Sequence, residues 1–169
     1  MTHIKGEITI ERPVEVVFDF VADERNEPRY NPRMLQAQKT SPGPIGPGTT
    51  FEARAVSRGK PVAMTVETTG YDRPRRLESS TKVPRMDIRG AVTFDPVPQG
   101  TAMRWSWDVR PHGLLKLMTP VIARIGRRQE QAVWAGLKDL LESGTDDGEA
   151  AAQRRYEGDE SDKSDEENM

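Results

Sequence analysis

The stretch "GTAMRWSWDVRPHGLLKLMTPVIARIGRRQEQAVWAGLKDLLES", residues 100–143, decides the fold, because it joins a strand to one long helix. Apolar and polar residues alternate over 101–110, with Met103, Trp105 and Trp107 on one side. Strict alternation predicts a β-strand with one buried and one solvent-exposed face. Both tryptophans are therefore expected to point away from water.

A single helix is expected from Pro120 to about Ser143, roughly 36 Å long at about 1.5 Å per residue. Its sheet-facing stripe is predicted to contain Ile122, Ile125, Gly126, Gln129, Val133, Gly136, Leu137, Leu140 and Leu141. The middle of this stripe is small or polar, whereas a closely packed interface would use larger side chains there. The sequence therefore predicts unfilled space beneath this part of the helix.

The rest of the folded region consists mainly of strands. Alternation over residues 3–11 predicts a first strand, and apolar spacing from Pro13 to about Asp23 predicts a helix. A short second helix is expected over 24–30. Turn residues then separate six more strands, at about 34–40, 49–57, 61–71, 76–83, 86–95 and 101–110. This order predicts an α+β fold, in which a curved seven-stranded antiparallel sheet wraps around the C-terminal helix.

Five segments carry a resemblance to a known family: "ITIERPVEVVFDFVAD" (8–23), "YNP" (30–32), "GPIGPGTTFEA" (43–53), "GTAMRWSWDV" (100–109) and "AGLKDLLES" (135–143). Over about residues 3–143 the chain resembles the polyketide cyclase/dehydrase-like SRPBCC proteins of the START/Bet v 1-like superfamily. The resemblance implies a helix-grip fold with two short helices after the first strand. The superfamily contains cyclases, lipid carriers, hormone receptors and co-chaperones, so the resemblance does not select one activity.

The two tryptophans can be interpreted as packed core or as the wall of a cavity between the sheet and the helix. The small helix residues favour a cavity of about 300–1,000 Å³ that binds a small hydrophobic molecule, such as a lipid or a polyketide-like aromatic. Its predicted lining is Tyr30, Phe51, Met64, Met86, Ile88, Met103, Trp105, Trp107, Ile122 and Gln129.

The segment between the last strand and the helix is a second candidate feature. His112, Gly113, Leu114 and Leu115 are interpreted either as a mobile apolar gate over the cavity mouth or as a turn that closes the core.

An alternative function is an enzyme of cyclase/dehydratase type that uses the same cavity. Tyr30 is the candidate proton donor, and Gln129, Ser79 and Thr81 are the other polar residues expected to face inward. The charged residues of the last two strands are expected on the outer face, namely Asp87, Arg89, Arg104 and Asp108. Whether the chain is an enzyme is left open.

Other kinds of site are not expected. The chain has no cysteine and two histidines, and no acidic cluster has ligand spacing, so neither a metal site nor a cofactor is predicted. No nucleophile elbow supports a Ser-His-Asp triad. The prolines of "GPIGPG" remove the amide donors that a phosphate loop needs. Arg124, Arg127 and Arg128 are interpreted as a solvated helix face, and no nucleic-acid partner is expected.

Residues 1–143 are predicted to form one domain, followed by a disordered acidic tail at 144–169. The tail contains ten acidic and three basic residues, which leaves 22 basic and 17 acidic residues in the domain. So polar a segment cannot bury enough apolar surface to fold. A third possible function is a protein partner or a homodimer engaged through this tail. With no apolar leader or spanning segment in the sequence, we expect a cytoplasmic protein without integral membrane association.

Overall fold

The computed structural model describes residues 1–144, except for the side chains of Leu115 and Thr119. The tail predicted over 144–169 therefore lies, apart from Gly144, outside the described residues. The elements are, in chain order, β1 (Thr2–Ile10), α1 (Val14–Ala22), the 3-10 helix η1 (Glu24–Arg29), β2 (Met34–Lys39), β3 (Thr50–Ser57), β4 (Lys60–Asp72), β5 (Arg76–Val83), β6 (Met86–Val97), β7 (Gly100–Pro111), the 3-10 helix η2 (Gly113–Met118) and α2 (Thr119–Ser143).

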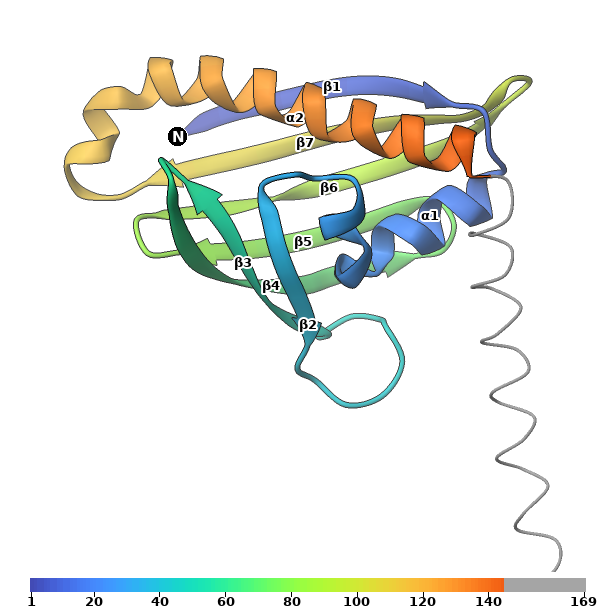
Figure 1. Cartoon of the computed structure of the whole chain (residues 1–169), viewed down its shortest axis with the longest axis horizontal. Helices are drawn as coiled ribbons and strands as arrows, with labels where there is room; N and C mark the ends of the chain where they lie inside the picture. The colour runs from blue at the N-terminus through green and yellow to red at the C-terminus, as the bar shows by residue number, and fades with distance from the viewer. Residues whose placement is uncertain (145–169) are drawn as a thin grey trace, which may run out of the picture.

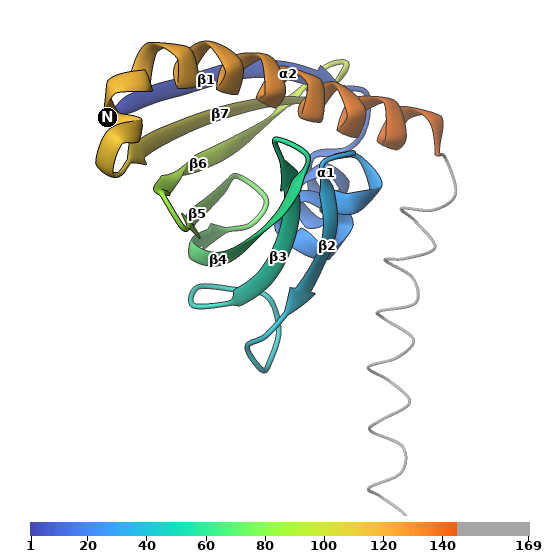
Figure 2. The ribbon, with the colours of Figure 1, turned by 60° about the vertical axis from the view of Figure 1, so that its left-hand side comes forward.

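The seven strands form one antiparallel sheet in the order β1-β7-β6-β5-β4-β3-β2. Figure 1 shows α2 running along β1 and β7, and Figure 2 shows how the sheet curves away from α2 toward β3 and β2. The predicted architecture is confirmed, including the two short helices after the first strand. Because α2 lies beside an edge strand, it covers one end of the sheet's inner face.

Alternation assigns each strand residue to a face of the sheet. Buried Leu77 lies opposite buried Val92, and on the same face Ser79 lies opposite Gly90 and Thr81 opposite Ile88. Ser79 and Thr81 therefore share the inner face, as predicted. The four charged residues expected outside do lie there, namely Asp87, Arg89, Arg104 and Asp108.

Two glycines make room for the paired tryptophans of β7. Gly6 lies opposite Trp105 on β1, and Gly90 lies opposite Trp107 on β6. A Cβ atom at Gly6 would approach the Trp105 ring to 2.3 Å, and one at Gly90 would approach the Trp107 ring to 2.7 Å and the Ser106 carbonyl oxygen to 1.9 Å. Each indole thus lies over a bare stretch of the neighbouring backbone.

The C-terminal half of α2 is tied to β1 by polar contacts. Lys138 Nζ donates to the Thr9 carbonyl oxygen at 2.8 Å and to Glu142 Oε1 at 2.6 Å. Glu142 Oε1 also accepts a bond from the Glu11 amide at 2.9 Å. Two side chains one helical turn apart therefore satisfy backbone groups at the open edge of β1.

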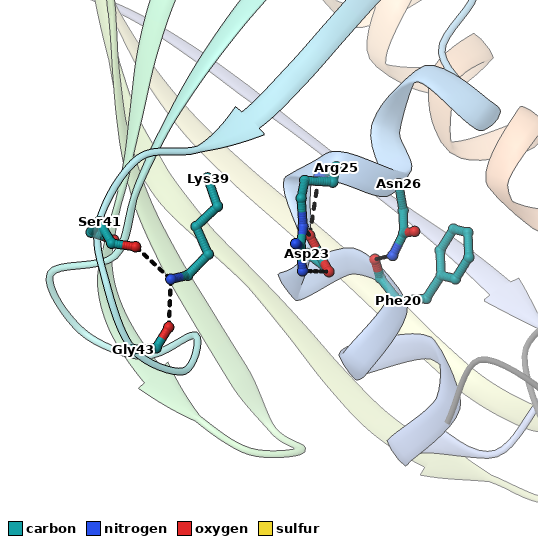
Figure 3. A network of polar contacts seen from close by, with 7 residues as sticks. All are labelled: Phe20, Asp23, Arg25, Asn26, Lys39, Ser41 and Gly43. Atoms are coloured by element: carbon teal, nitrogen blue, oxygen red, sulfur yellow. Dashed lines mark hydrogen bonds and ion pairs between the residues drawn. The ribbon is translucent and has the colours of Figure 1, made fainter. Parts of the chain in front are cut away.

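A polar network stabilises the turn between α1 and η1 (Figure 3). The buried Asp23 carboxylate accepts bonds from the Arg25 backbone amide and, through both oxygens, from its guanidinium. Asn26 Nδ2 donates to the Phe20 carbonyl oxygen at 3.0 Å. Nearby, Lys39 Nζ donates to the carbonyl oxygens of Ser41 and Gly43 and holds the turn between β2 and β3. These bonds position the segment that leads to Tyr30.

The predicted stripe of α2 is partly wrong. Ile125 was expected to face the sheet, but its side chain is 50% exposed. Val133, Leu137, Leu140 and Leu141 pack in or against the core as predicted, but the inward side of α2 also includes Glu130 and Trp134, which the predicted stripe omitted. Glu130 is not part of the predicted stripe, yet its carboxylate faces the sheet and reaches Trp107 of β7.

The glycine of β6 gives a direct test of this packing. We expect Gly90→Ala to lower the free energy of unfolding by about 1–3 kcal/mol, because the new methyl group meets backbone that cannot easily move. Gly46→Ala is the matched control, since a Cβ there meets no atom within 4 Å. Its effect should stay within about 0.5 kcal/mol. Urea denaturation of both variants measures the difference, and equal stabilities would contradict the packing described.

Candidate functional site

All three tryptophans of the chain meet beneath the middle of α2. The ring centroids of Trp105 and Trp134 are 5.7 Å apart, and Trp134 stacks on Tyr30 at 6.2 Å with an interplanar angle of 27°. Offset aromatic pairs at such separations stabilise a core beyond the area that they bury. The cluster joins residues from β7, from α2 and from the segment after η1.

Glu130 is the polar centre of this cluster. Its Oε2 atom accepts hydrogen bonds from Trp107 Nε1 at 2.9 Å and from Trp134 Nε1 at 3.0 Å. An indole N–H can only donate, so a carboxylate oxygen is a suitable partner for two of them. Burial raises the pKa of the Glu130 carboxyl, and the two indole bonds, which favour the charged form, oppose this rise.

Tyr30 is positioned by the residues that surround it in the chain and by α2. Asn31 Nδ2 donates to Glu27 Oε1 at 2.7 Å, and Asn31 Oδ1 accepts from the Arg33 amide at 3.0 Å. The Tyr30 carbonyl oxygen would lie only 2.5 Å from a Cβ at Gly136. A larger residue at this position of α2 would therefore push the Tyr30 segment away.

Two polar atoms of the cluster remain available. The Tyr30 hydroxyl and Glu130 Oε1 have no hydrogen-bond partner among residues 1–144. Arg12 Nε is the one side-chain nitrogen or oxygen atom of residues 1–144 that is buried without a hydrogen-bond partner. Tyr30 and Glu130 therefore each present an atom to solvent-accessible space, where it could bond to another molecule.

The protein environment favours the neutral forms of the Tyr30 hydroxyl and the Glu130 carboxyl more than water does. Burial raises the pKa of the Tyr30 hydroxyl well above its usual value, and the charges of Glu27, Glu24 and Glu130 raise it further. Burial also raises the pKa of the Glu24 carboxyl, as do the adjacent charge of Glu27 and a hydrogen bond with it. Tyr30 is thus a hydrogen-bond donor throughout the physiological range.

The predicted lining residues separate into two groups. Phe51, Met103 and Trp105 are almost fully buried, and Met103 and Trp105 belong to the main core cluster with Tyr30. The other predicted residues are only half-buried although they lie on the inner face of the sheet or on α2, namely Met64, Met86, Ile88, Trp107, Ile122 and Gln129. Solvent therefore still reaches the residues of the half-buried group.

The residues predicted as a gate lie at the start of α2, away from the core. His112 is exposed and contacts Asp87 at 3.1 Å on the outer face. Gly113 has a positive φ of 61°, and Leu114 is 85% exposed. Leu115 belongs to the same short helix, η2. Leu114 therefore does not close the core, because the short helix directs it into solvent.

The outer face contains a row of polar residues that the sequence analysis did not connect. His3 Nδ1 lies 2.8 Å from Asp108 Oδ1, and His3 Nε2 lies 3.1 Å from Ser106 Oγ. Ser106 and Asp108 line an open hollow of about 670 Å³. Because β7 pairs with a strand on each side, its backbone amides are used in the ladder and cannot stabilise an oxyanion. The row of Ser106, His3 and Asp108 therefore lacks the free backbone amides that a serine hydrolase uses to bind an oxyanion.

Among residues 1–144, no three His, Cys, Asp or Glu side chains gather in a way that could hold a metal ion. None of the helices in that region combines the length and the apolar character that crossing a bilayer requires. A second open hollow, of about 610 Å³, lies over β2, β3, β4 and the end of β5, on the outer face.

A sequence model of the family "Polyketide cyclase / dehydrase and lipid transport" matches residues 1–142. The chain belongs to this family. The resemblance noted in the sequence is thereby confirmed over residues 1–142. No curated protein sequence matches this family member significantly.

Solved structures show the same fold at low sequence identity. A START superfamily protein from Mycobacterium smegmatis is 11% identical with a TM-score of 0.75, and the match covers 86% of this chain and 100% of that one. Ara h 8.0201 is 16% identical with a TM-score of 0.66, covering 83% and 97%. The di-domain ARO/CYC BexL from the BE-7585A biosynthetic pathway is 22% identical with a TM-score of 0.71, covering 86% of this family member and 48% of BexL.

Sequence reasoning missed Glu130, Trp134 and Gly136 as parts of one site. The missed signal is the spacing of Gly126, Glu130 and Trp134, which are four residues apart and therefore share one helix face. A carboxylate one turn before a tryptophan on a helix that must cover a sheet is a recognisable pattern. The pattern is easily missed, because an acidic residue is normally exposed.

The raised pKa of Glu130 predicts a pH-dependent stability. An unfolded glutamate ionises near pH 4.5, whereas the folded Glu130 keeps its proton to higher pH. The stability of the wild type should therefore fall, relative to Glu130→Gln, as the pH rises from about 4.5 through the raised pKa. Thermal unfolding of both proteins between about pH 4 and pH 8 measures this difference.

Glu142→Gln is the matched control on the same helix. Its carboxylate accepts bonds from Lys138 and from the Glu11 amide, and these lower the pKa of Glu142. The wild type should therefore be more stable than this variant near neutral pH, and the advantage should disappear as the pH falls below 4.5 through the lowered pKa. The same pH trend in both variants would contradict the assignment of Glu130 as a buried carboxyl.

Proposed function

We propose that this protein binds a small hydrophobic molecule with a polar end on the inner face of the sheet, beside the first half of α2. The observation that carries the proposal is Glu130, which two indole N–H groups hold while its second oxygen remains accessible. Burying an ionisable group among aromatic rings is costly, so a site with this arrangement needs a reason. Binding the polar end of a ligand supplies one.

The half-buried apolar residues support the same proposal. Met64, Met86, Ile88 and Ile122 point inward, yet solvent still reaches them. Covering them with an apolar ligand would gain about 25 cal/mol per Å² of apolar surface removed from water. Ligand sites of proteins are commonly apolar surfaces with a few convergent polar groups, as here.

The polar groups select the chemistry of the ligand. Glu130 Oε1 can accept a hydrogen bond, and the charges near Tyr30 are negative. A ligand that offers a hydrogen-bond donor, such as a phenolic hydroxyl, would therefore bind better than the same hydrocarbon without one. We infer that the ligand is an aromatic or polyketide-like molecule with at least one hydroxyl group.

Catalysis of the cyclase/dehydratase type is the second candidate. Tyr30 carries a proton that it can donate, and Glu130 has a pKa closer to neutrality than an exposed glutamate has. A donor and an acid–base group beside one apolar surface could assist the loss of water from a β-hydroxy ketone. This candidate uses the same residues as ligand binding does.

Intrinsic fluorescence provides a test of binding, because all three tryptophans belong to the cluster. We expect 4-hydroxyazobenzene, which absorbs the indole emission, to quench this fluorescence on binding. Azobenzene, the same molecule without the hydroxyl, should bind about three- to tenfold more weakly, as expected for one lost hydrogen bond. Glu130→Leu should remove the difference between the two probes, since leucine accepts no hydrogen bond.

Ser106→Ala is the matched control for this titration. Ser106 lies between Trp105 and Trp107 in the chain but points to the outer face, so both affinities should be unchanged. Equal affinity of the wild type for the two probes, or no quenching by either, would refute the polar end of the proposed site.

Turnover distinguishes the enzyme from the carrier. With a β-hydroxy aryl ketone as the substrate, catalysis predicts water loss whose kcat falls by about 10²–10⁴ in Tyr30→Phe, with little change in KM. A carrier predicts that Tyr30→Phe alters binding of the ketone while no water is lost above the background rate. Product formation is measured by the absorbance of the conjugated enone.

A further inference from the structure

Exposed apolar side chains are concentrated at the start of α2. The described region has seven large hydrophobic residues that are exposed, and five of them lie within twelve residues, namely Leu114, Leu117, Met118, Val121 and Ile125. Leu114 and Leu117 are 85% and 81% exposed. Scattered single hydrophobic residues are normal on a surface, but a contiguous apolar patch marks a binding surface.

The orientation of α2 creates this patch. With Gly126 and Glu130 turned toward the sheet, Val121 and Ile125 occupy the opposite side of the helix. The short helix η2 directly precedes α2 at the same end of the molecule (Figure 1), and it contributes the exposed side chains of Leu114 and Leu117. We call these five apolar residues the η2–α2 patch.

Basic residues accompany the η2–α2 patch. Arg124, Arg127 and Arg128 are exposed on the same part of α2, and none forms an ion pair with a residue of the described domain. The first two turns of α2 contain no acidic residue. The patch is therefore apolar and positively charged at once, which is the pattern of helices that lie in the interface of a membrane.

Two other occupants fit less well. The acidic segment 144–169 has a matching charge, but it contains no Leu, Ile, Val, Phe or Trp that could cover exposed leucines. A second copy of the chain, packed through the same patch, would place arginines against arginines. An anionic bilayer surface accepts the leucines among its acyl chains and pairs the arginines with its headgroups.

We propose that the η2–α2 patch docks this protein on the surface of an anionic membrane. In this pose Leu114 and Leu117 insert at the level of the headgroups, while Arg124, Arg127 and Arg128 contact lipid phosphates. The docked surface lies on the same helix segment as Ile122 and Gln129, which border the inner face of the sheet. A hydrophobic ligand could thus move between the bilayer and the inner face over a short distance, although docking itself does not depend on such a ligand.

Co-sedimentation of the full chain with lipid vesicles tests the proposal. Vesicles in which about a third of the lipid is phosphatidylglycerol should bind the protein, and binding to pure phosphatidylcholine should be at least about tenfold weaker. Raising the salt from about 0.01 M to about 0.15 M should weaken the binding, since it screens the arginines. Leu114→Asp/Leu117→Asp and Arg124→Gln/Arg127→Gln/Arg128→Gln should each reduce binding at least about tenfold.

Matched controls come from the opposite end of the sheet. Leu35→Asp on β2 removes another exposed leucine, and Arg54→Gln/Arg58→Gln removes exposed charge from β3 and its hairpin. Both should bind vesicles as the wild type does. Quenching by 4-hydroxyazobenzene should persist in the patch variants, which keeps this test separate from that of the ligand site.

Three results would overturn the proposal. The first is failure of the full chain to bind anionic vesicles, and the second is equal binding to both kinds of vesicle. The third is a change of molar mass in Leu114→Asp/Leu117→Asp, measured by light scattering, because it would assign the patch to contact between copies of the chain. Circular dichroism confirms that each variant is folded, as expected for exposed positions.

Discussion

The inward placement of one carboxylate, Glu130, determines how the rest of the molecule is arranged. A charged group beneath a helix must be compensated, and here two indole N–H groups from different elements converge on one of its oxygens. The pair links α2 to β7 and fixes the rotation of the helix. That rotation brings Trp134 against Trp105 and Tyr30, and it turns Ile125 outward. The proposed binding site and the exposed apolar patch therefore have one cause.

The sheet could be predicted from the sequence almost completely, because alternation identifies its faces without any knowledge of packing partners. Ser79 and Thr81 were placed inside, and Arg89 and Asp108 outside, by this rule alone. The helix was harder to predict. Its polar residues fall on more than one side, and the usual preference of glutamate for water favoured an orientation that buried Ile125. Of the two indole donors that bind Glu130, Trp134 is one turn away on the same helix, but Trp107 belongs to β7 and its approach to the helix is visible only in the structure.

The sequence predicted several residues of the candidate site correctly, but it did not predict which of them are packed core and which border accessible space. Trp105 and Met103 were expected to line a cavity, but they are packed core, and Trp107 is the tryptophan that borders accessible space. The difference follows the length of the strands. Leu77, Val92 and Phe94 are buried in the core cluster, whereas Met86 and Ile88, farther along the inner face of β6, are only half-buried. Alternation assigns a residue to a face but does not say how much of that face a helix covers.

The bonds from Lys138 and Glu142 to the backbone of β1 have a consequence for solution behaviour. An edge strand with free amides and carbonyls can recruit a strand from another molecule and start aggregation. On β1 the Thr9 carbonyl is already occupied, and at the opposite border a register shift between Met34 and Gln36 interrupts the short strand β2. These two features shorten the regular backbone template that the borders of this open sheet present to a strand of another molecule.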